Sequence, residues 1–225
     1  MLSFLIVIPV YNEESVLGDL IKVLKDLGLL KFTLFVNDGS TDKTEEIFES
    51  EGVKYISLER NMGKGFAQRV GFNEALKREV DAIITMDGDL QHPPYLVFEF
   101  LRKLEEGYDI VIGTRWRELS KMPKDRYLSN RLTTLAISIL CRRRVEDSQS
   151  GYRAYRKEVI KDLKFSSNKF EAESELLIKG LLSGKKVGYV NIPANYHEKL
   201  RSKINRFVDT LRFLKMYFGL VWKKS

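Results

Sequence analysis

The stretch Ala82-Ile83-Ile84-Thr85-Met86-Asp87-Gly88-Asp89 decides the fold. Its first five residues are apolar apart from Thr85, which is typical of a strand that is covered on both faces. Such a strand lies in the middle of a sheet that carries helices on both sides. The stretch therefore predicts a central strand with two carboxylates, Asp87 and Asp89, at its carboxyl end.

Strand and helix patterns alternate around this stretch. Apolar runs predict strands over residues 4–10, 32–36, 53–58, 82–86 and 109–113, and helical spacing predicts helices over residues 14–27, 42–51, 66–78 and 95–105. Four successive strand-helix units favour an α/β fold with a Rossmann-like, mostly parallel central sheet and helices on both faces. The second half is less regular. We expect a helix over residues 129–143, a short strand and helix after residues 147–153, a helix up to residue 182, a strand over 186–192, and an amphipathic helix over 205–222.

Length and composition support one globular domain over residues 1–225. The chain is 44% hydrophobic and 31% charged, which excludes disordered, collagen-like and low-complexity proteins. Cys141 is the only cysteine, so no disulfide forms within one chain and a reducing compartment is expected. The apolar start at residues 2–9 lacks the flanks of a signal peptide, and no uncharged stretch approaches the roughly 20 residues of a membrane span.

The positive charge is concentrated in two segments. The whole chain carries a net charge of +7, yet residues 115–144 hold nine Lys/Arg against two acids, and residues 197–225 hold eight against two. The rest of the chain is therefore acidic. Each basic segment is either a solvated helix face or a surface that attracts anions.

The Asp87-Gly88-Asp89 turn is the strongest chemical signal. With Gln91 it offers two carboxylates and an amide oxygen, a ligand set suited to Mg²⁺ or Mn²⁺ that is shared with substrate phosphates. Asp38 follows another strand; it either caps the next helix or accepts hydrogen bonds from a base or ribose, with Pro9, Tyr11 and Glu13 as the opposite wall. Lys64, between two glycines, does not have the spacing of a P-loop, so we expect those glycines to serve backbone packing or the start of a helix.

Seven stretches, taken together, closely resemble glycosyltransferase family 2. They are Val7 to Glu13, Val36 to Asp42, Asn61 to Gly65, Met86 to Pro94, Gly113 to Arg115, Asp147 to Arg153 and Ser202-Lys203. The stretches follow one another in the order and spacing of the family, and the similarity spans residues 4 to about 215. Within the family the chain is most similar to the dolichyl-phosphate mannose synthase and polyprenyl-phosphate glycosyltransferase branch. The resemblance implies the GT-A fold, nucleotide-diphosphate sugar donors, Mg²⁺ or Mn²⁺, and inversion at the anomeric carbon.

The resemblance also implies roles for individual residues. Residues 1–115 would form the nucleotide-sugar half, residues 116–200 the acceptor half and residues 201–225 a basic C-terminal helix. The nucleoside and sugar would contact Pro9, Tyr11, Glu13, Val36, Asp38 and Gly88; the metal would bind Asp87, Asp89 and Gln91; Asp89, Arg115 and Lys203 would act on the donor; Arg126, Ser129 and Asn130 would bind the acceptor phosphate. The glycine that the branch usually shows before Ser202-Lys203 is missing, so Arg201, Lys199 or His197 is expected to supply a displaced cation.

The expected reaction moves a hexose, mannose or glucose, from a nucleotide-diphosphate sugar to a polyprenyl phosphate. An acceptor phosphate is ionised at neutral pH and needs no general base. The protein would then lie on the cytoplasmic face of a membrane, through its basic segments and with a membrane-anchored partner, and nucleic acid is not expected as a ligand. Two alternatives remain: a soluble family 2 transferase acting on a glycan or small-molecule hydroxyl, and a non-catalytic nucleotide-sugar-binding module.

Overall fold

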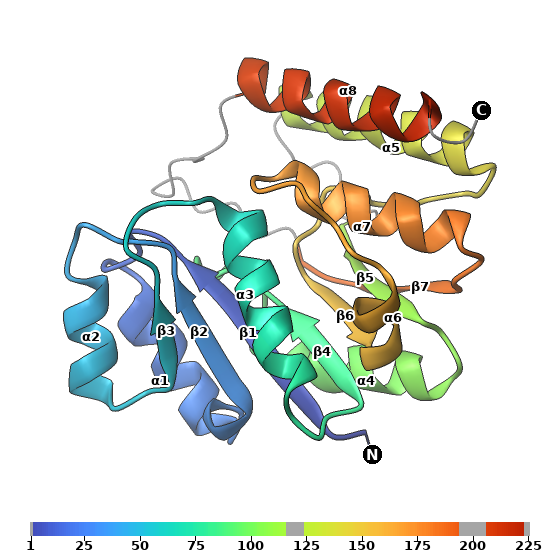
Figure 1. Cartoon of the computed structure of the whole chain (residues 1–225). Coiled ribbons are helices and arrows are strands. Elements are labelled where there is room, and N and C mark those ends of the chain that lie inside the picture. Colours follow the sequence, from blue (N-terminus) through green and yellow to red (C-terminus); the bar gives the residue numbers. More distant parts are fainter. Residues whose placement is uncertain (1, 116–123, 194–205, 223–225) are drawn as a thin grey trace.

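A central sheet lies at the middle of the molecule (Figure 1). A computed structural model describes residues 2–115, 124–193 and 206–222. Within these residues the sheet has seven strands in the order β3-β2-β1-β4-β6-β5-β7. They are β1 (Phe4–Val10), β2 (Thr33–Asn37), β3 (Tyr55–Ser57), β4 (Ala82–Thr85), β5 (Ile110–Thr114), β6 (Arg153–Arg156) and β7 (Val187–Asn191). Neighbouring strands are parallel except at β6, which is antiparallel to both β4 and β5.

Helices cover both faces of this sheet, as predicted. They are α1 (Leu17–Asp26), α2 (Thr44–Glu51), α3 (Lys64–Leu76), α4 (Val97–Glu105), α5 (Lys124–Cys141), α6 (Lys157–Asp162), α7 (Glu171–Leu182) and α8 (Arg206–Trp222), with short 3-10 turns at Leu30–Phe32 and Pro94–Leu96. Because side chains alternate along a strand, Ile6 and Ile8 of β1 pack with α1 and α4, while Leu5 and Val7 pack with α3 and α7. The sheet therefore separates two apolar cores.

Strand β6 explains how a distant segment reaches the carboxyl edge. Arg153 pairs with Thr85 of β4 and with Ile112 of β5. Since β6 runs against its neighbours, its first residue lies where they end, and residues 147–152, which precede it, lie at the same edge. The sequence predicted a short strand here but not its direction or its place inside the sheet.

Two helix starts differ from the sequence prediction by three or more residues. Helix α1 begins at Leu17 rather than at residue 14, because the backbone of Val16 is not helical, with φ −129° and ψ −13°. Before the helix, the carbonyl of Glu13 accepts hydrogen bonds from the backbone N–H groups of Val16 and Leu17. The backbone N–H of Glu13 also donates to Oγ1 of Thr44, at the start of α2. Helix α5 begins at Lys124, five residues before the predicted start. The polar loop after β1 is thus tied to the loop after β2.

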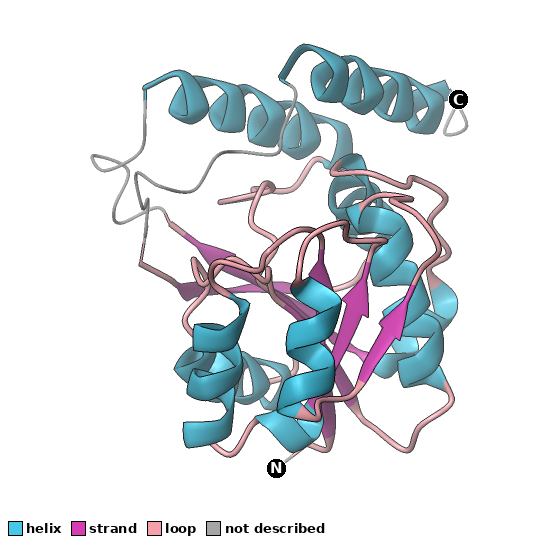
Figure 2. Ribbon diagram, turned by 90° about the vertical axis from the view of Figure 1, so that its left-hand side faces the viewer, coloured by secondary structure: helices cyan, strands magenta, loops and turns pink. Residues whose placement is uncertain are grey.

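Helices α5 and α8 cover one end of the molecule (Figures 1 and 2). Helix α8 packs on α7 and runs beside α5, where the hydroxyl of Tyr217 donates to the carbonyl of Ala136 at 3.2 Å. Leu128, Leu132, Leu135 and Ile139 of α5, and Leu211, Leu214 and Phe218 of α8, remain exposed on these helices. None of the helices in the described ranges is both long and apolar enough to cross a membrane.

Candidate active site

The two aspartates after β4 lie in a turn that is held in place by its own backbone. The N–H of Asp87 donates to Nδ1 of His92 at 3.0 Å, and the N–H of Gln91 donates to Oδ1 of Asp89 at 3.0 Å. Between them Gly88 packs against β1, where an added Cβ would lie 3.1 Å from Val10. The turn is therefore fixed against the end of β1.

His92 supports this turn as a neutral ring. Burial lowers its pKa to about 4, so Nδ1 is free to accept the Asp87 N–H at neutral pH. For the same reason the 3.8 Å approach of Nδ1 to the Asp87 carboxylate is not an ion pair. The ring stacks on Tyr152, whose hydroxyl donates to the carbonyl of Pro93.

The carboxylates of Asp87 and Asp89 repel one another at this edge. Burial, with the negative charge of Asp87 as the second cause, raises the pKa of Asp89 to about 6, and Glu13 adds to the effect. Burial alone would raise the pKa of Asp87, but the ammonium of Lys64 lowers it to about 2. A bound cation would relieve this repulsion.

This donor set fits a hard divalent cation. Carboxylate and amide oxygens are the ligands of Mg²⁺ and Mn²⁺, and Mg²⁺ commonly takes only one or two protein carboxylates and completes its shell with phosphates and water. Over residues 2–115, 124–193 and 206–222 no three His, Cys, Asp or Glu side chains are grouped as a complete protein-only metal site. Asp87, Asp89 and Gln91 would therefore hold a cation together with a substrate.

Lys64 joins this cluster from the first residue of α3. Its Nζ lies 2.6 Å from Oδ1 of Asp87 and 2.8 Å from Oε1 of Glu173 on α7. The sequence drew attention to Lys64 only as a lysine between glycines and to His92 only as part of the run that follows the two aspartates, and it gave no signal for Glu173. Gly63 and Gly65 allow close packing, as expected. An added Cβ would lie 2.5 Å from the Asn168 carbonyl oxygen at Gly63, and 2.4 Å from Cβ of Ala172 at Gly65.

Arg115 lies beside the same cluster, at the end of β5. Its guanidinium donates through Nε and Nη2 to the two carboxylate oxygens of Asp147, at 2.9 and 3.0 Å. Arg115 is also close enough to Asp87 for its charge to favour the ionised carboxylate. Fork-shaped binding of this kind is the geometry in which arginine also recognises phosphate.

Buried Arg153 fixes the segment that carries Asp147. Its guanidinium donates to the carbonyls of Ser148, Ser150 and Glu173 at 2.6 to 2.8 Å. An arginine with no exposed surface that bonds three carbonyls holds residues 148–150 in one conformation and ties them to α7. Asp147 is in this way presented to Arg115 by a rigid support.

The expected nucleoside residues gather at the ends of β1 and β2. Asp38 is buried, and its two carboxylate oxygens accept the backbone N–H groups of Met62 and Gly63 at 2.7 and 2.8 Å. Burial nevertheless raises the pKa of Asp38. Asp42, not Asp38, bonds the first N–H of α2, so Asp38 ties β2 to the start of α3.

Two further nucleoside candidates belong to the sheet itself. Val36 is fully buried in the core of β2, so it can reach a ligand only through its backbone. Pro9 is half-buried and pairs with Val36 across the two strands. Tyr11 and Glu13 follow directly in the loop after β1.

The expected acceptor residues lie on α5. Thr134 bonds to Ser148 through their hydroxyls at 2.9 Å, which anchors α5 on the segment that carries Asp147. Asn130 lies one turn before Thr134 and is half-buried, whereas Ser129 is exposed. Arg126 belongs to the first turn of α5, and its side chain is not among those described; Arg201 and Lys203 lie outside the described residues.

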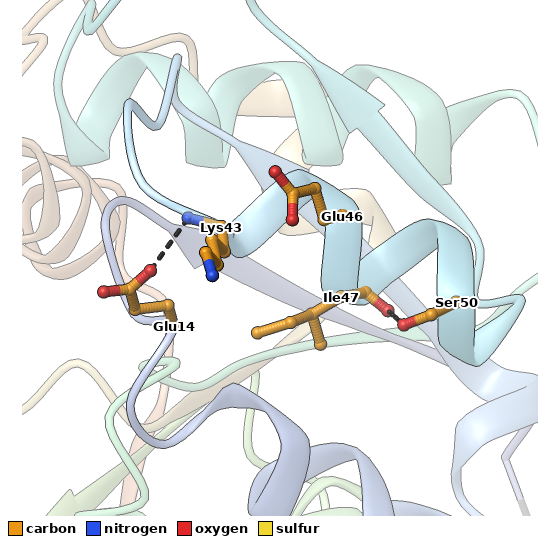
Figure 3. A pocket seen from close by; sticks show the side chains of 5 residues that line it. All are labelled: Glu14, Lys43, Glu46, Ile47 and Ser50. Carbon is orange, nitrogen blue, oxygen red and sulfur yellow. Dashed lines mark hydrogen bonds between the residues drawn. The ribbon is translucent and has the colours of Figure 1, made fainter.

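A shallow hollow lies apart from these residues (Figure 3). It has an empty volume of about 750 Å³ and is lined by Glu14, Lys43, Glu46, Ile47 and Ser50. Glu14 accepts the backbone N–H of Lys43 across it at 2.9 Å. None of the expected site residues lines this hollow, so we do not assign the chemistry to it.

Known proteins resemble this chain in sequence and in fold. The model of glycosyl transferase family 2 matches residues 5–164. An uncharacterised protein of Methanocaldococcus jannaschii is 36% identical over 227 residues, which covers 97% of this chain and 91% of that protein. The fold is similar to that of glucosyl-3-phosphoglycerate synthase of Mycobacterium tuberculosis, with a TM-score of 0.75 at 22% identity, covering 97% of this chain and 80% of that one.

Two relatives are named as transferases for dolichol phosphate and undecaprenyl phosphate. A dolichol-phosphate mannosyltransferase of Pyrococcus furiosus is 32% identical over 189 residues, which is 79% of this chain and 53% of that protein. An undecaprenyl-phosphate 4-deoxy-4-formamido-L-arabinose transferase of Proteus mirabilis is 36% identical over 165 residues, 69% of this chain and 49% of that protein. The chain thus spans about half the length of each. From the family match and these identities, the chain belongs to glycosyl transferase family 2 and is a glycosyltransferase with the GT-A fold.

Proposed function

We propose that this glycosyltransferase moves a hexose from a nucleotide-diphosphate sugar to a polyprenyl phosphate. The observation that carries the proposal is that the Asp87–Asp89 turn and the guanidinium of Arg115, which Asp147 holds, lie near one another at one edge of the sheet. Carboxylates that can hold a cation, next to a fixed cationic fork, suit a diphosphate leaving group. The two relatives named for polyprenyl acceptors support the choice of acceptor.

The donor would lie along the carboxyl edge, with its diphosphate at the acidic turn. A neighbour in fold, the mycobacterial synthase, has been solved with Mn²⁺ and uridine-diphosphate-glucose. Asp87, Asp89 and Gln91 would hold the cation, which when bound neutralises charge on the departing diphosphate. Tyr11 and Glu13, after β1, would contact the nucleoside beside Asp38.

The chain's own residues would then direct the transfer. Arg115 would offer the other N–H groups of its guanidinium to a phosphate, while the bonds of Nε and Nη2 to Asp147 keep the guanidinium oriented. An acceptor phosphate, with a second pKa near 6, is ionised at neutral pH and attacks the anomeric carbon without a general base. Arg126, Ser129 and Asn130 on α5, with Lys203 and Arg201, are proposed to bind acceptor and donor phosphates.

We also propose that the α5/α8 end of the molecule rests on an anionic membrane surface. The apolar side chains exposed there belong to two neighbouring helices whose flanking segments carry most of the excess Lys and Arg. Apolar side chains with surrounding cations are what an interfacial helix presents to lipid headgroups. This placement would bring the carboxyl edge of the sheet close to a lipid phosphate.

A transfer assay tests the reaction. The protein is incubated with radiolabelled GDP-mannose or UDP-glucose and a short-chain polyprenyl phosphate, with Mn²⁺, Mg²⁺ or EDTA, and the organic phase is counted. We expect metal-dependent label in the lipid phase and its loss in Asp89→Asn. Asp26→Asn, an exposed aspartate at the end of α1, is the matched control and should keep wild-type activity.

The same assay separates the two alternatives. Label that is transferred only to water-soluble glycans or small hydroxyl compounds would replace the polyprenyl acceptor with a hydroxyl one. A protein that binds the nucleotide sugar but neither transfers nor hydrolyses it, in any of these mixtures, would contradict catalysis by this chain.

A further inference from the structure

Lys64 is the centre of a buried ion-pair network that connects two helices, α3 and α7, to the acidic turn. Its Nζ bridges Asp87 after β4 and Glu173 on α7, and the same Glu173 oxygen accepts a hydrogen bond from Nε2 of Gln68 at 2.8 Å. Lys64 and Glu173 are largely buried and Gln68 is buried. The site residues expected from the sequence do not include Lys64, Gln68 or Glu173.

This network places a lysine where helices ordinarily disfavour a positive charge. Lys64 is the first residue of α3, where the helix dipole disfavours a cation. Gly151 leaves the space for it, because an added Cβ there would lie 2.6 Å from Nζ of Lys64 and 2.9 Å from Oδ1 of Asp87. A buried lysine at an unfavourable helix end, with a glycine opposite, indicates that its contact with Asp87 is what the site requires.

The charges of the three groups explain why two acids surround one lysine. Lys64 alone would cancel the charge of Asp87 and weaken the attraction of the turn for a cation. Glu173 shares the ammonium, so Asp87, Lys64 and Glu173 together keep a net charge of −1 while one oxygen of Asp87 stays oriented. Residues that orient a metal-binding side chain and adjust the local charge in this way commonly alter metal affinity by about 10–100-fold when they are substituted.

We propose that Glu173 and Lys64 are positioning residues that orient Asp87 and set the affinity of the acidic turn for a divalent cation. The proposal rests on the proposed function, in which this turn holds the cation of the nucleotide sugar. Glu173 acts through Lys64 and belongs to α7, a helix that the expected site did not include.

Direct Mn²⁺ binding, measured by electron paramagnetic resonance with and without nucleoside diphosphate, tests the proposal. We expect Glu173→Gln to weaken Mn²⁺ binding by about 10–100-fold, with unchanged binding of metal-free nucleoside diphosphate. Lys64→Met combined with Glu173→Gln restores the net charge of −1 but not the contact that orients Asp87, so the double variant should recover the part of the affinity that is due to charge and bind Mn²⁺ more tightly than the single variant, which a merely structural role would not produce.

Glu175→Gln is the matched control. Glu175 lies two residues along the same helix, is equally buried and pairs with Lys179 rather than with the acidic turn. It should lower the melting temperature but leave the Kd for Mn²⁺ unchanged. The proposal would be overturned by a folded Glu173→Gln protein with the wild-type Kd for Mn²⁺, or by a double variant that binds Mn²⁺ no more tightly than the single variant. A wild-type protein that binds no Mn²⁺ under any condition would overturn the metal site of the proposed function as well.

Discussion

Arg115 carries its charge on a planar fork, and this shape matters more than the charge alone. Both of its bonds to Asp147 use parallel N–H groups, which the single ammonium of a lysine cannot reproduce. Arg115→Lys is therefore expected to lower kcat by roughly 10–100-fold with little change in stability, because a fixed donor to the leaving phosphate is lost. Steady-state transfer at saturating donor measures this.

Arg102→Lys is a suitable control for that change. Arg102 is an exposed arginine on α4 that also binds two carboxylates, those of Glu99 and Glu106. It should keep the wild-type kcat. Equal rates for Arg115→Lys and the wild-type protein would show that the guanidinium fork does not act on the donor.

Two helical glycines differ in the space around them, and this difference can be measured as stability. An added Cβ at Gly71 of α3 would lie 2.2 Å from Cγ1 of Val7, whereas nothing lies within 4 Å at Gly18 of α1. Gly71→Ala should lower the free energy of unfolding by about 1–3 kcal/mol through overpacking. Gly18→Ala should raise it by up to about 1 kcal/mol through helix propensity, and urea unfolding of both proteins distinguishes the two effects. A Gly71→Ala protein as stable as Gly18→Ala would mean that α3 packs less closely on β1.

At the scale of elements, the sequence predicts local patterns well and long-range partners poorly. Asp87 and Asp89 could be predicted because the apolar strand and the acidic turn are adjacent in the chain. Glu173 could not, because it meets Gln68 and Lys64 from more than a hundred residues away and looks like any acid in the first turn of a helix. The direction of β6 could not be predicted either, because a strand of only four residues is compatible with either orientation.

The junction between α6 and α7 depends on one buried carboxylate. Glu175 accepts the backbone N–H groups of Ser166 and Ser167 at 2.9 to 3.2 Å and pairs with Lys179. Burial alone would raise the pKa of Glu175, but the bonds from Lys179 and Ser167 lower it below the ordinary value of a glutamate. The ionised carboxylate therefore stabilises the folded state above the unfolded pKa of about 4.3, and this stabilisation is lost as the pH falls through the lower folded pKa.

Glu175→Gln is therefore expected to cost about 1–3 kcal/mol at pH 7, because the charged bonds to the loop are weakened. The difference from the wild-type protein should shrink as the pH falls below about 4.3, since the wild-type carboxylate then becomes neutral too. Thermal unfolding from pH 7 to pH 3 gives the measurement. Glu74→Gln, at a partly exposed i,i+4 pair with Arg78, is the control and should cost less than about 1 kcal/mol. If the cost of Glu175→Gln does not depend on pH, the charge of Glu175 has no role at this junction.

For the whole molecule, the separation of charge gives a test of the membrane-facing end. The excess positive charge lies in residues 115–144 and 197–225, which lead into or contain α5 and α8, while the remaining chain is acidic. Binding to vesicles of phosphatidylcholine and phosphatidylglycerol should therefore weaken between about 0.1 M and 1 M NaCl, as the Debye length falls from about 10 to 3 Å. The binding that remains at high salt should depend on the apolar side chains of the two helices.

The apolar contribution is separable from the charge by substitution on α8. Leu214 and Phe218 are exposed and lie one turn apart, so Leu214→Asn with Phe218→Asn should reduce co-sedimentation at 1 M NaCl while leaving thermal stability nearly unchanged. Phe98→Asn is the matched control, because Phe98 is an exposed aromatic residue on α4 rather than on α5 or α8. If the Phe98 variant loses as much binding as the α8 variant, the attachment is not specific to that end, and the lipid phosphate would have to reach the carboxyl edge of the sheet by another route.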